Sequence, residues 1–202
     1  MNNHHDSEIQ WAGRILIATG LLTIILMLLH PDSWQAGVMI PLVHGSLQAV
    51  IVVQVGAMIV GMRSYGWNLW ITTGMLFVGA GYLAGTGAAT INGFMMPAFL
   101  DRVDGEALPQ IRQLVWEADQ ALARLGVIAT GIGFVLWAVM LWRHAQRVLA
   151  VAGMVAGLIP ALLLASGHLN MHLHGAILVY TAQALWVIAL GWSFARRKPI
   201  AD

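Results

Sequence analysis

Long apolar stretches separated by short polar segments dominate the chain. Six of them are long enough to cross about 30 Å of hydrocarbon, which takes about 20 helical residues. These stretches lie at residues 11–30, 37–62, 67–92, 121–142, 147–167 and 172–194. The pattern therefore predicts an all-α integral membrane protein, in which residues 1–202 form a single domain of six transmembrane helices.

The charged residues between the stretches predict the orientation. Basic residues concentrate on one side of the predicted membrane, at Arg14, Arg63, Arg143, Arg147 and the run Arg196-Arg197-Lys198. The segments on the other side carry acidic residues, namely Asp32, Asp101, Asp104, Glu106, Glu117 and Asp119. Because cytoplasmic segments are enriched in Lys and Arg, we expect both termini in the cytoplasm and the protein in a bacterial-type inner membrane.

The longest connection, residues 93–120, is expected to be a long periplasmic loop. Within it, residues 105–120 predict a short amphipathic helix, since the apolar residues Leu108, Ile111, Leu114 and Val115 recur at helical spacing. His4 and His5, in the polar segment 1–10, are expected to belong to a disordered tail. In the predicted spans, Gly81 and Gly85, and Gly153 and Gly157, are four residues apart, a spacing typical of closely packed membrane helices.

Two segments of the chain resemble one helical hairpin written twice. The first contains Arg14, Gly20, His30, His44-Gly45 and Gln54, and the second contains Arg147, Gly153, His168, His174-Gly175 and Gln183 in the same order. This pattern suggests a duplicated two-helix hairpin, formed by spans one and two and by spans five and six. A pseudo-twofold axis along the membrane normal would then bring His44 and His174 face to face.

Composition excludes several classes of function. Of the 202 residues, 59% are hydrophobic and 9% are charged, and the mean hydropathy is +0.75. The absence of cysteine excludes disulfides, thiolate metal sites and a cysteine nucleophile. A net charge of +1 gives no electrostatic case for nucleic-acid binding. No charged residue lies in the middle of a predicted span, so no proton or ion relay of a transporter is visible.

Histidines supply the candidate chemistry. Histidine is costly inside a membrane, yet five histidines fall on the predicted periplasmic side, namely His30, His44, His168, His172 and His174. Neutral imidazole is a common ligand of Zn, Cu and haem iron. We therefore predict a histidine-ligated metal or haem centre near the periplasmic face of an oxidoreductase or electron-transfer protein. The centre is either haem b with His44 and His174 as axial ligands or a transition metal (Cu, Zn or Fe) held by this histidine cluster. Methionines on the same side could assist copper: Met27, Met39, Met95, Met96 and Met171.

Two carboxylates suggest an alternative function. Glu117 and Asp119 begin the fourth span on the side of the histidines, where either could act as a general base or as a partner of a metal ligand. The protein would then be a membrane enzyme that acts on a lipid or another apolar small molecule, with or without a metal. An electron-transfer protein with a redox partner, and a structural or assembly subunit without chemistry, are the other classes that the sequence leaves open.

Overall fold

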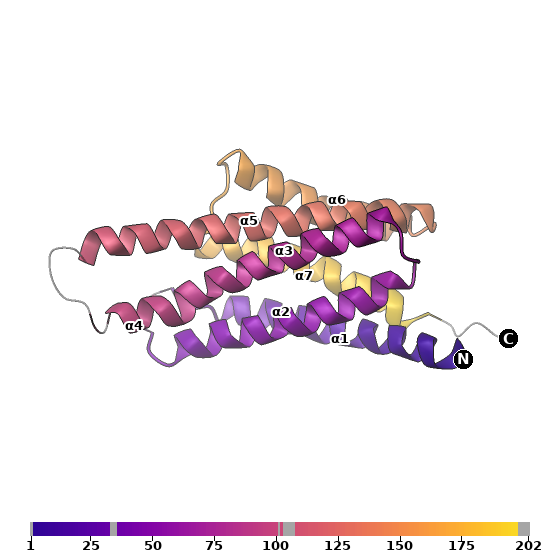
Figure 1. Ribbon diagram of the computed structural model, residues 1–202, viewed down its shortest axis with the longest axis horizontal. Helices are drawn as coiled ribbons and strands as arrows, with labels where there is room; N and C mark the ends of the chain where they lie inside the picture. The colour runs from indigo at the N-terminus through magenta and orange to yellow at the C-terminus, as the bar shows by residue number, and fades with distance from the viewer. Residues whose placement is uncertain (1, 33–35, 101, 103–107, 198–202) are drawn as a thin grey trace.

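The computed structural model describes residues 2–32, 36–100, 102 and 108–197, with side chains from residue 6 onward. Asp101, Asp104, Glu106 and Lys198 therefore lie outside the described residues. Every regular element in the described part is helical (Figure 1): α1 (Asn2–Leu28), α2 (Met39–Arg63), α3 (Leu69–Thr90), the π-helix η1 (Ile91–Met95), α4 (Met96–Leu100), α5 (Leu108–Arg143), α6 (Arg147–Ala165) and α7 (Leu173–Ala195).

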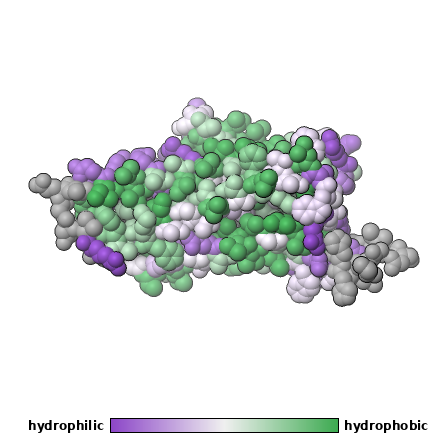
Figure 2. Space-filling model, in the orientation of Figure 1, coloured by the Kyte–Doolittle hydropathy of each residue, from purple (hydrophilic) through white to green (hydrophobic). Residues whose placement is uncertain are grey.

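Six helices in this part of the chain are long and apolar enough to cross a membrane. Hydrophobic side chains cover the middle of the surface in Figure 2, and hydrophilic ones gather toward its ends. The start of α1 and the end of α7 lie at the same end of the bundle (Figure 1), as an even number of spans requires. We call the opposite end, where α2, α5 and α7 begin, the distal end.

The predicted loop over residues 93–120 is wrong, because helices occupy most of this segment. The third span continues through η1 and α4 to Leu100, and α5 runs without interruption for 36 residues from Leu108. The predicted amphipathic helix and the fourth span are therefore one helix. Pro109 stands in the first turn of α5, where proline is tolerated, and no helix-breaking residue follows before Gly126.

The predicted disordered tail is also wrong, because α1 begins at Asn2. Ile9 of this segment is buried. Glu8 pairs with Arg63 at 2.9 Å, and the Gln10 side chain donates a hydrogen bond of 2.9 Å to the carbonyl of Arg197. The first turns of α1 are thus held against the ends of α2 and α7.

Glycines let neighbouring helices approach to backbone contact. The closest pairs are Gly13 with Gly191, between α1 and α7; Gly81 with Gly126, between α3 and α5; and Gly131 with Gly157, between α5 and α6. A Cβ on Gly157 would lie only 2.5 Å from the carbonyl oxygen of Gly131. The close approach predicted for Gly81 and Gly157 is confirmed. Gly85 has room around it, because a Cβ there would lie 3.8 Å from the Tyr180 hydroxyl.

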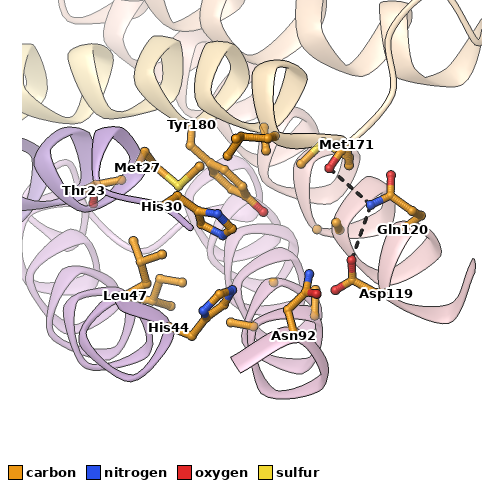
Figure 3. A pocket seen from close by; sticks show the side chains of 18 of the residues that line it. Thr23, Met27, His30, His44, Leu47, Asn92, Asp119, Gln120, Met171 and Tyr180 are labelled. Carbon is orange, nitrogen blue, oxygen red and sulfur yellow. Dashed lines mark hydrogen bonds between the residues drawn. The ribbon is translucent and has the colours of Figure 1, made fainter. Parts of the chain in front are cut away.

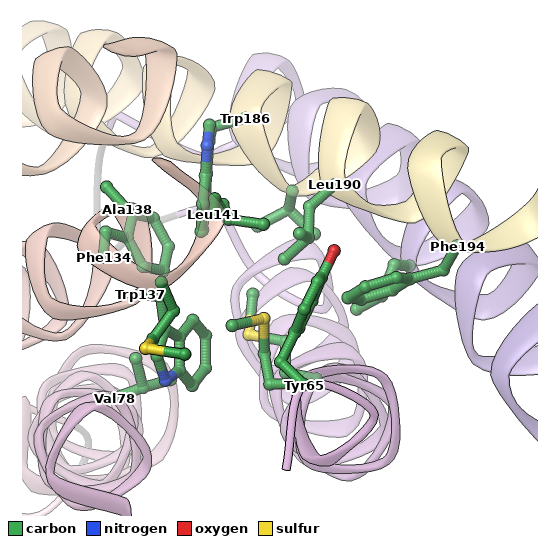
Figure 4. Packing of buried hydrophobic residues seen from close by; sticks show 14 of the residues in the cluster. Tyr65, Val78, Phe134, Trp137, Ala138, Leu141, Trp186, Leu190 and Phe194 are labelled. Atoms are coloured by element: carbon green, nitrogen blue, oxygen red, sulfur yellow. The ribbon is translucent and has the colours of Figure 1, made fainter. Parts of the chain in front are cut away.

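Large aromatic residues fill the half of the bundle nearer the termini. Phe134 and Trp137 of α5 pack with Trp186 and Phe194 of α7 in one buried cluster (Figure 4). The rings of Phe134 and Trp186 are 4.2 Å apart between centroids. The buried indole N–H of Trp137 donates to the carbonyl of Ile71 at 3.3 Å, so its polar atom is satisfied. This half has a solid core, whereas the distal half holds a cavity beside two smaller buried clusters.

Substitution at a glycine contact should destabilise the bundle. We expect Gly131→Ala to cost about 1–3 kcal/mol, because its Cβ would press against the backbone of Gly157 in α6. Gly56→Ala is the matched control, since a Cβ there has nothing within 4 Å. Thermal unfolding in detergent, followed by tryptophan fluorescence, should show a lower midpoint for the first variant only. Equal midpoints would contradict the packing described here.

Candidate functional site

A cavity of about 370 Å³ occupies the distal half of the bundle. Side chains from α1, α2, α3, η1, α5 and α7 line it, together with the segment before α7 (Figure 3). Much of the wall is apolar, with Met27, Leu47, Ala88 and Ala123 among the lining residues. A mostly apolar cavity with a few polar side chains is the usual form of a small-molecule site.

His44 is the most buried polar group in the wall contributed by α2, with 4% of its surface exposed. Its Nδ1 lies 2.8 Å from the carbonyl oxygen of Ile40 and must carry the proton that this hydrogen bond needs. Nε2 is then a lone-pair acceptor, and it is buried without a hydrogen-bond partner among the described residues. Gly93 of η1 allows this close packing, since a Cβ there would collide with the imidazole side chain.

His30 follows the end of α1 and packs edge-on against His44, with ring centroids 4.7 Å apart (Figure 3). Its Nδ1 donates to the carbonyl of Pro31 at 3.0 Å. Burial lowers the pKa of His30 below 6.5, and the neighbouring His44 lowers it further, while the Pro31 carbonyl acts in the opposite direction. His30 is therefore neutral at neutral pH.

Asp119 and Gln120 of α5 form a second polar group in the wall, each with 3% of its surface exposed. The Gln120 amide nitrogen donates to Oδ2 of Asp119 at 3.4 Å and to the carbonyl of Met171 at 3.2 Å (Figure 3). These bonds tie α5 to the segment before α7. The side chain of Asn92 also bonds to the carboxyl group of Asp119. Oδ1 of Asp119 and Oε1 of Gln120 are buried without a well-formed hydrogen bond within the described part of the chain.

Two glutamines mark the deeper part of the cavity. Gln54 of α2 donates a hydrogen bond of 2.6 Å to the hydroxyl of Tyr82. Gln183 of α7 is 4% exposed, and its amide nitrogen is buried with no acceptor among the residues described. The repeated hairpin pattern pairs these two glutamines, and both line the cavity. That pairing was the available clue to this part of the site, although neither residue was predicted to belong to it.

The structure brings two of the five predicted histidines together. His168, His172 and His174 are exposed and are not among the residues that line the cavity. Nδ1 of His168 bonds to the hydroxyl of Ser166 at 2.9 Å, and the ring of His172 packs edge-on against Trp116 at 5.2 Å.

These positions leave the metal predictions without structural support. Among the described residues, no group of three or more histidine, aspartate and glutamate side chains could hold a metal ion. His174 does not reach the cavity that His44 lines, so the predicted pair of haem ligands is not assembled there. The duplication of the hairpin stays a prediction.

The two predicted carboxylates have different surroundings. Asp119 lies in the cavity wall, whereas Glu117 is exposed and accepts a hydrogen bond of 3.1 Å from Gln113. Of the five predicted methionines, Met27 and Met171 line the cavity. Lining residues that were not predicted as site residues include Asn92, Gln120, Tyr82, Tyr180 and Trp116.

Comparison with models of known protein families, with curated proteins and with solved structures finds no significant match to this chain. The cavity itself is therefore the basis for a functional proposal.

The titration of His30 tests the geometry of the imidazole pair. The midpoint of an NMR pH titration of His30 should lie below pH 6.5. His44→Gln should raise this midpoint, because it removes the neighbouring imidazole. The folded state holds His30 neutral where the unfolded chain would protonate it, so its contribution to stability is lost as the pH falls below 6.5. The unfolding midpoint of the wild type should therefore fall more steeply with acidification than that of His30→Gln. An NMR titration midpoint of His30 at or above pH 6.5 would contradict its buried contact with His44.

Proposed function

We propose that this protein binds a small apolar molecule with a hydrogen-bonding polar end inside its helix bundle. One observation carries the proposal: four buried side-chain atoms in the cavity wall lack hydrogen-bond partners within the described part of the chain, namely Nε2 of His44, Oδ1 of Asp119, Oε1 of Gln120 and Nε2 of Gln183. Buried polar groups in proteins are nearly always satisfied, and a cluster of exceptions calls for an occupant that satisfies them.

The energetic argument follows from burial. An unsatisfied buried polar atom costs about 1–3 kcal/mol, so four of them amount to a large part of the roughly 5–15 kcal/mol that stabilises a typical domain. A ligand whose polar end bonds to these atoms removes that cost when it binds. The apolar wall, which includes Leu47, Ala88 and Ala123, suits the rest of such a molecule.

The same polar atoms supply acid–base capacity. The carbonyl of Ile40 fixes the tautomer of His44, so its free Nε2 can accept a proton from a bound molecule. Gln120 orients the carboxyl of Asp119 on another wall of the cavity. Of the two carboxylates expected to serve in an acid–base enzyme that acts on a lipid or apolar small molecule, Asp119 is the one that lines the cavity. Ligand binding is the prerequisite for any such reaction.

A second candidate function is the binding of Cu(I) by His30 and His44. Each imidazole uses Nδ1 to bond a backbone carbonyl, at 3.0 and 2.8 Å respectively, which leaves its Nε2 as the metal-binding atom. Met27 lies next to His30 in the wall (Figure 3), and thioethers beside imidazoles suit Cu(I). This candidate retains the predicted copper centre with two of its histidines.

A cavity-filling substitution tests the first candidate. Gly85 lines the cavity and has room for a side chain, so Gly85→Leu should occupy the binding space without displacing a neighbouring helix. Gly79→Leu in the same helix is the control, because a Cβ there meets nothing within 4 Å and Gly79 does not line the cavity. Native mass spectrometry with 1-decanol as the probe should detect one bound molecule in the wild type and the control. Affinity should fall on the order of tenfold or more in Gly85→Leu. Equal binding of the probe by Gly85→Leu and Gly79→Leu would refute the proposal.

Metal titration tests the second candidate. Purified protein should bind one Cu(I) per chain in competition with a chromogenic chelator, and His30→Ala and His44→Ala should each abolish that binding. His168→Ala should not affect it, since His168 is exposed and does not line the cavity. The candidate fails if the wild type binds no Cu(I), or if the loss is the same in all three variants.

A further inference from the structure

The polar atoms at the distal part of the cavity are hydrogen-bond acceptors. The tautomer of His44 makes its Nε2 an acceptor, because Nδ1 carries the proton donated to Ile40. Oδ1 of Asp119 is an acceptor in a carboxylate. The amide of Gln120 is oriented by its two donated bonds, to Asp119 and to the carbonyl of Met171, so Oε1 is its free atom. A ligand that satisfies this group must bring donors.

Charge narrows the chemistry further. Asp119 is 3% exposed, and its side-chain contacts are amides, with no lysine or arginine paired to it among the described residues. A buried carboxylate is costly unless a positive charge is close to it. Asp32 and Arg112 also line the cavity, but both are exposed, and they carry charges of opposite sign. In the part of the chain that the structure describes, the cavity therefore lacks a buried cation opposite Asp119.

From this arrangement we propose that the ligand is a lipophilic amine, an apolar molecule that ends in a protonated primary amino group. An ammonium group has three donors and no acceptor, so it suits a wall whose free atoms at His44, Asp119 and Gln120 are acceptors. Its charge neutralises Asp119. An alcohol has one donor and a carboxylate has none, so neither matches as well. Aromatic side chains in the wall, Trp116 and Tyr180, also favour a cation over an anion.

The remainder of the cavity suits an apolar chain. Leu47, Ile51, Ala88 and Ala123 are among the residues that line it. Gln183 offers a donor to an oxygen further along such a chain. The inference rests on the proposed function, because it specifies the polar end of the molecule that the cavity binds.

A matched series of probes tests the inference on the full chain in phosphatidylcholine nanodiscs at about pH 7.5, with empty nanodiscs as the blank. Decylamine, 1-decanol and decanoate share one apolar chain and differ in the polar end. Decylamine should bind tightest, at least about tenfold more tightly than 1-decanol, because charge-assisted hydrogen bonds are roughly twice as strong as neutral ones. Decanoate should bind weakest, since Asp119 repels it.

Two variants test whether Asp119 causes the preference for decylamine over 1-decanol. Asp119→Asn should abolish the preference, so that this variant binds decylamine no more tightly than it binds 1-decanol. Glu117→Gln removes the same charge from the same helix at an exposed position outside the cavity, and it should keep the preference for the amine.

The outcomes separate the inference from the proposed function. If 1-decanol binds as tightly as decylamine in the wild type, or if the preference survives Asp119→Asn, the inference is overturned while the proposed function stands. If neither probe binds in the wild type, both are overturned. Loss of the preference in Glu117→Gln as well would show a general attraction of cations to the protein and would also overturn the inference.

Discussion

Backbone contact at glycines determines how the helices of this bundle are spaced. Between membrane helices there is little hydrophobic driving force, so close packing carries much of the stability. Glycine contacts join α1 to α7, α3 to α5, and α5 to α6. The glycines of α2 differ, because a Cβ on Gly45 or Gly61 would meet a phenylalanine ring and one on Gly56 would meet nothing. Side chains therefore determine how far α2 lies from its neighbours.

The space between α2 and the rest of the bundle differs between the two halves. Nearer the termini, the large residues Phe134, Trp137 and Phe194 fill it and are fully buried. In the distal half the space remains a cavity, and polar side chains face it. The solid half fixes the helices, and the hollow half provides the space that the proposed ligand would occupy.

The polar side chains of the cavity are oriented before any ligand binds. A backbone carbonyl fixes the ring of His44, and Gly93 packs against it from η1. Gln120 fixes the carboxyl of Asp119 and is itself anchored to Met171. The π-helical turn at η1 brings Gly93 to its position, in keeping with the frequent occurrence of such turns at functional sites. Groups oriented in advance lose little entropy on binding, which favours affinity.

Hydropathy was sufficient to predict the number of spans and most of their ends. The second, fifth and sixth spans were predicted within two residues at each end, because the transition from apolar to polar residues coincides there with the end of the helix. The prediction from hydropathy failed at residues 93–120, because a helix that leaves the hydrocarbon can continue in the polar region. Hydropathy reports the surroundings of a residue, and it does not report where the backbone stops being helical.

The candidate site was predictable in part, for a reason that lies in helix rotation. Sequence position shows how deep a residue lies along a helix more readily than which way it faces. Glu117 and Asp119 are two residues apart, which is about 200° around a helix, so they cannot both face the cavity. His44 and His174 each precede a glycine near the start of a helix, yet His44 is buried and His174 is exposed. Tertiary packing determines how each helix is rotated about its axis, and the spacing of the His-Gly motif does not predict that rotation.

An experimental structure of the protein in lipid would test the central claim most directly, namely that a molecule with a polar end completes the hydrogen bonds of the distal cavity. The account predicts continuous density in the cavity, with its polar end within hydrogen-bond distance of Nε2 of His44 and Oδ1 of Asp119 and its apolar part along Leu47 and Ala123. A cavity that holds only separate water molecules, each bonded to these polar atoms, would contradict it.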